Sequence, residues 1–213
     1  MKKLKHLLFI AAFMPLCSNA AEEPEWKNPA VNQQNRAERR ASFFAFENEK
    51  LATGADKTKS SRYLSLEGMW KFNFVKDYTD RPLDFFKVEY EDGSWDTMPV
   101  PGMWELNGYG DPVYLNVGYA WRGQYANNPP FPADWHNYVG QYRKTFTIDE
   151  NWKGKDIFLH IGSATSNVRV WINGKEVGYS EDSKLEARFD ITKFVKTGEN
   201  LIALEIFRWC DGT

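Results

Sequence analysis

The chain has 213 residues, with 27 basic and 29 acidic side chains and a formal net charge of −2 at neutral pH. This balance gives no basic patch for nucleic acid and no positive surface for an anionic membrane. Nine tryptophans, ten tyrosines and fifteen phenylalanines make the chain rich in aromatic residues. Aromatic rings stack on sugars, but they also fill β-sandwich cores, and core filling accounts for most of the individual residues.

Residues 1–20 have the pattern of a secretory signal peptide. Three lysines among the first five residues precede an apolar run over residues 7–13, and the segment closes at Ala20. The apolar run is much shorter than the roughly 20 residues that a transmembrane helix needs. Cys17 invites a lipoprotein interpretation, but the residues before it lack the expected small side chains. We therefore expect a cleaved, exported product that begins near residue 21 and is periplasmic or extracellular.

Cleavage at that point would leave 193 residues, enough for one domain with a substantial core and an additional arm. The product would have 24 basic and 29 acidic side chains, a net charge near −5, and Cys210 as its single cysteine. Because one thiol cannot form an internal disulfide, its stability must come from burial of apolar side chains.

The first part of the product is irregular. Residues 21–60 have no sustained hydrophobic period and are polar, which indicates an extended arm with a helical turn around residues 36–40. Over residues 70–75, aromatic and other side chains alternate with period two, as in a half-buried strand. The two prolines in residues 95–101 favour an edge strand or the start of a loop.

Residues 102–137 contain many aromatics and prolines without periodicity, and long irregular loops of this kind are usually functional. Asn173-Gly174 is a tight hairpin turn signal. No segment has a helical stripe longer than two turns. Short strands are predicted around residues 142–148, 157–161, 168–172, 175–179, 189–191 and 201–209. The pattern predicts an all-β antiparallel sandwich over residues 61–213.

Several segments match a known family in a fixed order. They are residues 25–36, 66–72, 99–105, 108–109, 112–117, 171–179, 182–185, 189–191 and 208–213. Together they span most of the expected mature chain, from residue 25 to residue 213, and the ordered set resembles the N-terminal sugar-binding jelly-roll domain of glycoside hydrolase family 2. Within that family the resemblance is to the bacterial β-galactosidases.

The resemblance implies two site residues. Asn116, in a Tyr-x-Asn-Val segment, and Asp211, in an Arg-Trp-x-Asp-Gly segment, are expected to contact the galactosyl unit. Asp211 is also implied as a ligand of a shared sodium ion, and Mg²⁺ as a cofactor of the full-length enzyme. An amide and a carboxylate suit sugar hydroxyls as hydrogen-bond partners. The structural alternative is that Asn116 closes a turn and Asp211 bonds backbone after the last strand.

Retaining glycoside hydrolysis needs two carboxyl groups about 5 Å apart. The resemblance implies that both come from a barrel beyond residue 213, so we expect no catalytic residue here and no activity from the chain alone. The implied partners are a β-galactoside, the remainder of a β-galactosidase chain and further copies in a homo-oligomer. The alternative is a non-catalytic carbohydrate-binding or assembly module, and β-glucuronidase or β-mannosidase activity is less favoured.

The remaining candidates have simpler interpretations. His136 and His160 lie far apart without acidic or cysteine partners at ligand spacing, which disfavours zinc. Glu181 and Asp182 are adjacent, so on an extended chain they should point to opposite faces, and we expect both to be solvated. Arg208 is expected to have a paired structural role.

Overall fold

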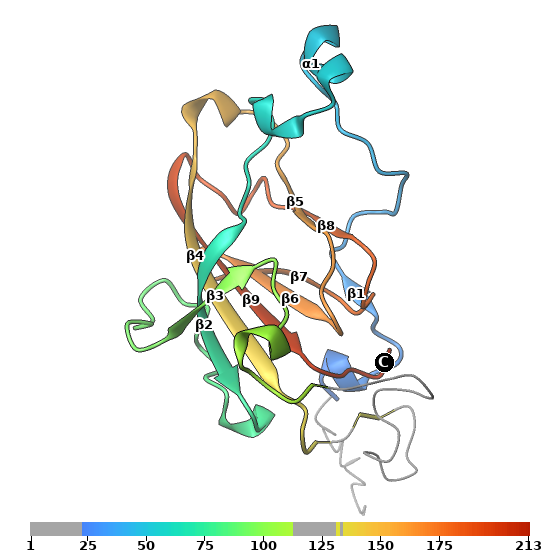
Figure 1. The fold of residues 1–213 in the computed structure, drawn as a ribbon, viewed down its shortest axis with the longest axis vertical. Helices are drawn as coiled ribbons and strands as arrows, with labels where there is room; N and C mark the ends of the chain where they lie inside the picture. Colours follow the sequence, from blue (N-terminus) through green and yellow to red (C-terminus); the bar gives the residue numbers. More distant parts are fainter. Residues whose placement is uncertain (1–22, 113–130, 133) are drawn as a thin grey trace, which may run out of the picture.

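The computed structural model describes residues 23–112, 131–132 and 134–213 (Figure 1). The expected signal peptide and Asn116 lie outside these residues. The described chain is an antiparallel β-sandwich, which confirms the all-β prediction. Within the described residues, no helix has the length and apolar character needed to cross a membrane.

Two sheets make up the sandwich. The larger has seven strands in the order β1-β7-β6-β9-β4-β2-β3, and the smaller pairs β5 with β8. The strands are β1 (Gln33–Gln34), β2 (Gly68–Val75), β3 (Asp96–Val100), β4 (Val139–Ile148), β5 (Phe158–Ile161), β6 (Val168–Ile172), β7 (Lys175–Ser180), β8 (Ala187–Asp190) and β9 (Gly198–Phe207). All the pairings are antiparallel.

The core lies between the two sheets. Phe72 of β2 and Tyr142 of β4 share one buried cluster with Leu159 of β5 and Phe189 of β8. The long central strands β4 and β9 pair over their whole length, from Val139 opposite Phe207 to Ile148 opposite Gly198. β9 ends at Phe207, and the chain continues from there into the C-terminal turn.

Local signals in the sequence predicted several of these elements correctly. Asn173 and Gly174 have φ angles of 51° and 78°, the left-handed conformation of a tight hairpin turn between β6 and β7. β3 is an edge strand, as Pro99 within it and Pro101 just after it indicate. β9 begins at Gly198, earlier than predicted, because Asn200 bonds backbone in the preceding turn and also pairs with Phe146.

The N-terminal arm differs from the prediction. Residues 36–40 form no helix, since Arg36 donates to Ser180 and Asp182 and the Ala37 amide donates to the Arg188 carbonyl. These contacts hold the arm extended along the sandwich. The helices in the described residues are α1 (Glu49–Gly54) and the 3-10 turns η1 (Glu25–Lys27), η2 (Lys57–Lys59), η3 (Tyr78–Asp80), η4 (Glu105–Asn107) and η5 (Glu150–Trp152).

Figure 1 shows the consequence for the arm. Its first part, with η1 and β1, lies beside β7 and the C-terminal end of the chain, whereas α1 projects at the opposite end of the molecule. The segment 25–36 is therefore part of the sandwich and supplies its edge strand, Gln33 opposite Ser180 and Gln34 opposite Tyr179.

Candidate functional site

Asp211 lies in the turn after β9, which two backbone contacts hold in place. On one side, the side chain of fully buried Asn137 bonds both the amide and the carbonyl of Trp209, at 2.9 and 3.1 Å. On the other side, the Asp211 amide donates to the Trp26 carbonyl at 3.0 Å. The backbone of Asp211 is thus fixed, and its side chain is left for other contacts.

Three potential ligand groups converge at this turn. The carboxylates of Asp211 and Glu181 and the thiol of Cys210 each have an atom within 4.8 Å of the others. Glu181 follows β7 directly and is only 7% exposed. The Tyr179 hydroxyl donates to Glu181 Oε1 at 2.7 Å, so one oxygen of this carboxylate has a fixed partner.

The electrostatics of the pair follow from its burial. Burial raises the pKa of Glu181 to about 8, the hydrogen bond from Tyr179 opposes that rise, and the carboxylates of Asp211 and Glu25 add to it. Burial also raises the pKa of the Cys210 thiol, which keeps it neutral.

Asp211 Oδ1 is buried and has no hydrogen-bond partner among the described residues. Two carboxyl groups bond each other only when one of them is protonated, so a proton on Glu181 would satisfy Asp211. With both groups ionised, Asp211 would instead need an external donor or a cation. The turn therefore presents a buried acceptor that is completed only by a proton on Glu181, by a cation or by an external donor.

The oxygen atoms of Asp211 and Glu181 fit a hard cation, because such ions take oxygen ligands and the unpaired Oδ1 would gain a partner. The neutral thiol of Cys210 does not suit such an ion. His136 and His160 belong to no group of metal-ligating side chains in the described part of the chain.

The solvated environment predicted for Glu181 is wrong. Glu181 is only 7% exposed, and its backbone amide donates to the Asn32 carbonyl of the arm at 3.1 Å. Asp182 points to other partners, an ion pair with Arg36 at 3.1 Å and one with Arg39. A signal was present in the sequence, since Glu181 continues the period-two series of buried Val177 and Tyr179.

Arg208 has the structural role expected of it. Its guanidinium lies over the rings of Tyr138 and Trp209, and it donates to the His136 carbonyl at 3.5 Å. These contacts brace the start of the turn that carries Asp211.

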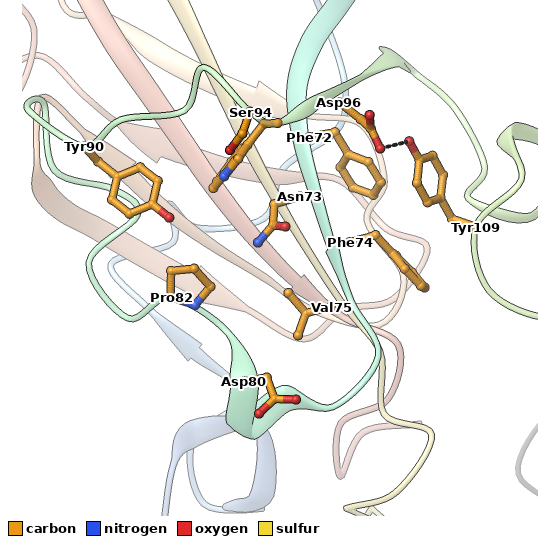
Figure 2. A pocket seen from close by; sticks show the side chains of 11 residues that line it. Phe72, Asn73, Phe74, Val75, Asp80, Pro82, Tyr90, Ser94, Asp96 and Tyr109 are labelled. Carbon is orange, nitrogen blue, oxygen red and sulfur yellow. Dashed lines mark hydrogen bonds between the residues drawn. The ribbon is translucent and has the colours of Figure 1, made fainter.

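A separate hollow of about 420 Å³ lies at the open end of β2. β3 pairs only with Gly68 to Phe72, so the last three residues of β2 have no partner on that side in the described residues. Figure 2 shows the Asn73, Tyr90 and Ser94 side chains at this hollow, with the Tyr109 hydroxyl donating to Asp96 at 3.0 Å. Neither Asp211 nor Glu181 lines it, so it is distinct from the carboxylate site.

Comparisons with known proteins agree with the architecture. A family model described as "Glycosyl hydrolases family 2, sugar binding domain" matches residues 63–213. The β-galactosidase of Priestia megaterium is 40% identical over 191 residues, which is 89% of this chain and 18% of that protein. The β-galactosidase large subunit of Leuconostoc lactis is 35% identical over 168 residues, 73% of this chain and 27% of that subunit.

Among solved structures, a calcium-binding mutant of Bacteroides uniformis β-glucuronidase 2 is 22% identical, with a TM-score of 0.48, over 67% of this chain and 14% of that one. That distant likeness carries no argument for a metal or a substrate here. The chain spans only 18% to 27% of the length of the two curated relatives above. The family match over residues 63–213 shows that the chain belongs to glycoside hydrolase family 2, as its N-terminal sugar-binding domain.

Proposed function

We propose that this chain is the N-terminal part of a β-galactosidase and that Asp211 contacts the galactosyl unit in a composite active site. The observation that carries the proposal is the buried Oδ1 of Asp211, which has no hydrogen-bond partner among the described residues although its backbone is held on both sides. Curated β-galactosidases that match 89% of the chain support the same assignment.

The chemistry of Asp211 suits this role. An ionised carboxylate accepts a hydrogen bond from a sugar hydroxyl, and such charge-assisted bonds contribute about 1.5–3 kcal/mol. Asp211, with Glu181 beside it, would also hold a sodium ion, which would offset their like charges and offer a coordination position to a sugar oxygen. Asn116 completes the proposed contacts, on the basis of the motif resemblance alone, because it lies outside the described residues.

The reaction itself needs two further carboxyl groups about 5 Å apart. On the basis of the family resemblance, we assign them to a barrel domain of a longer chain. We expect the isolated chain to show no hydrolysis of a chromogenic β-galactoside above the uncatalysed rate. Turnover by a homogeneous sample that disappears when an acidic residue of this chain is changed would contradict the assignment of the catalytic carboxylates to another domain. On the basis of the same resemblance, we assign magnesium binding and homo-oligomer formation to the longer enzyme.

The substrate class is tested with the chain joined to its natural downstream sequence or to the catalytic portion of a related enzyme. Hydrolysis rates are compared for nitrophenyl β-galactoside, β-glucuronide and β-mannoside. We expect the galactoside to be cleaved fastest, and a preference for either of the other two would overturn the assignment.

We also infer that the protein is exported after cleavage near residue 21, from the signal-peptide pattern of residues 1–20. Expression of the full chain in a bacterial host, followed by fractionation and N-terminal sequencing, tests this. Recovery in the cytoplasm with residues 1–20 intact would contradict export.

A further inference from the structure

The N-terminal segment 25–36, called the arm segment below, contacts both carboxylate residues of the site through its backbone. The Trp26 carbonyl accepts from the Asp211 amide at 3.0 Å, and the Asn32 carbonyl accepts from the Glu181 amide at 3.1 Å. We propose that the arm segment is a structural part of the site and that Trp26 is a positioning residue for Asp211. Only the expected effect of Trp26 on enzyme activity rests on the proposed function.

The Trp26 ring explains how the carbonyl is held. Trp26 is 3% exposed and stacks on Phe207, with ring centroids 4.8 Å apart and planes at 21°. Tyr78 packs edge-on against the same ring at 5.1 Å. Phe207 ends β9, and Asp211 follows four residues later, so the ring fixes the Trp26 carbonyl relative to the strand that leads into the site.

The rest of the arm segment is anchored independently. Glu25 forms an ion pair with Arg169 and accepts a hydrogen bond from Gln34 at 3.1 Å. Gln33 and Gln34 form the edge strand beside Ser180 and Tyr179, immediately before Glu181. The arm segment is therefore anchored at both ends. This anchoring also holds the Trp26 and Asn32 carbonyls in their contacts with Asp211 and Glu181.

The turn at Gly212 packs closely against Glu181. A Cβ added at Gly212 would lie 3.3 Å from Glu181 Oε2, a closer approach than most real Cβ contacts. Asn137 holds the turn from one side through Trp209, and the arm segment supplies the hold on the other side. Loss of the arm contact would free the Asp211 side of this turn.

Cys210 provides a readout that does not depend on activity. It precedes Asp211, is 2% exposed and is the one cysteine in the described part of the chain. The rate of its modification by a thiol reagent under native conditions reports on opening of the turn. The measurement uses the full chain with Cys17→Ser, which removes the other thiol.

We expect Trp26→Ala to raise the modification rate by about tenfold or more, because local opening no longer requires global unfolding. Trp26→Phe keeps a stacking ring and should restore slow modification. Phe85→Ala is the matched control, since Phe85 is equally buried but lies in a separate cluster with Trp171. Equal rates in Trp26→Ala and Phe85→Ala at equal thermal midpoints would overturn the proposal.

If Trp26→Ala does not fold, hydrogen exchange in the unaltered chain decides the question. The Asp211 and Glu181 amides both bond to the arm segment, so they should exchange with the same opening free energy, below that of the β4 and β9 amides. Exchange of the Asp211 amide together with β9, and apart from Glu181, would contradict the proposal.

In the longer enzyme, Trp26→Ala should lower kcat/KM on a β-galactoside by about tenfold, with rescue by Trp26→Phe and little change in Phe85→Ala. Full activity in Trp26→Ala would overturn the positioning role. If the parent enzyme cleaves no galactoside, the proposed function fails while the Cys210 result still decides the role of the arm segment.

Discussion

Glu205 and Glu181 are both 7% exposed, yet their surroundings differ. Glu205, near the C-terminal end of the central strand β9, accepts from Gln141 at 2.9 Å and lies 3.4 Å from the Arg81 guanidinium. Glu181 has the Tyr179 hydroxyl as its donor and another carboxylate, Asp211, as its neighbour. No lysine or arginine in the described ranges forms an ion pair with it.

Burial raises the pKa of both glutamates, but at Glu205 the charge of Arg81 and the hydrogen bond from Gln141 oppose the rise. A buried carboxylate that is paired with a cation, as Glu205 is with Arg81, needs no further partner and has a structural role. One that faces a second carboxylate is costly unless a proton, cation or ligand completes it. This difference supports the proposal that the end of β7, and not the middle of the sheet, binds a ligand or cation.

The largest expected effect is on Glu205, whose charge is offset by Arg81. Arg81→Met leaves Glu205 buried without its cation, so the free energy of unfolding should fall by about 3 kcal/mol at neutral pH. Urea unfolding measures this. The double change Arg81→Met with Glu205→Gln is the control and should recover most of the loss, because no buried charge remains. A loss below about 1 kcal/mol in the single variant would show that Glu205 does not depend on Arg81.

A smaller effect should distinguish Glu181 by its pH dependence. Its pKa in the folded protein is about 8 against an ordinary value of 4.5. Between these two pH values the folded state therefore binds more protons than the unfolded state. The stability that protonated Glu181 contributes is complete below about pH 4.5 and is lost as the pH rises through about 8.

Glu181→Gln cannot titrate, so its thermal midpoint should decline less between pH 5 and 8 and exceed that of the parent at pH 9. Melting in sodium-free buffer across this range is the measurement. Parallel curves for the two proteins would show that Glu181 is ionised throughout and would break the comparison with Glu205.

The smallest effect is expected for an ion pair in solvent. Lys153 lies 3.2 Å from Glu150, with side chains 76% and 67% exposed. Lys153→Ala should change the free energy of unfolding by less than about 0.5 kcal/mol, because water screens the pair. A loss comparable to that of Arg81→Met would mean that burial is not what separates these carboxylates.

The parts of the fold predicted from the sequence are those with local signals. The period-two aromatics of β2 and the Asn173-Gly174 turn depend only on neighbouring residues. The helical turn expected at residues 36–40 is wrong because Arg36 and Arg39 find Asp182, a partner far away in the sequence. The separate pairing of β5 with β8 is likewise a tertiary result that periodicity does not specify.

The candidate site divides in the same way. Asp211 is assigned to the site by the resemblance of its motif, whereas residue spacing alone favours a structural role. The burial of Glu181 is not predicted, because two adjacent acidic residues on an extended chain suggest solvated side chains. The structure instead places Glu181 beside Asp211 and bonds its amide to the arm segment. The contact between Trp26 and Asp211 joins the two ends of the described chain, and no local pattern indicates it.

The central claim is that Asp211 serves the site and not the fold. Asp211→Asn in the longer enzyme keeps the shape of the side chain but removes its charge. We expect kcat/KM on a β-galactoside to fall by roughly tenfold to a few hundredfold, the equivalent of one charge-assisted hydrogen bond, with an almost unchanged thermal midpoint. Unchanged kinetics with a large drop in the midpoint would contradict the claim and show that Asp211 is a structural residue at the end of β9.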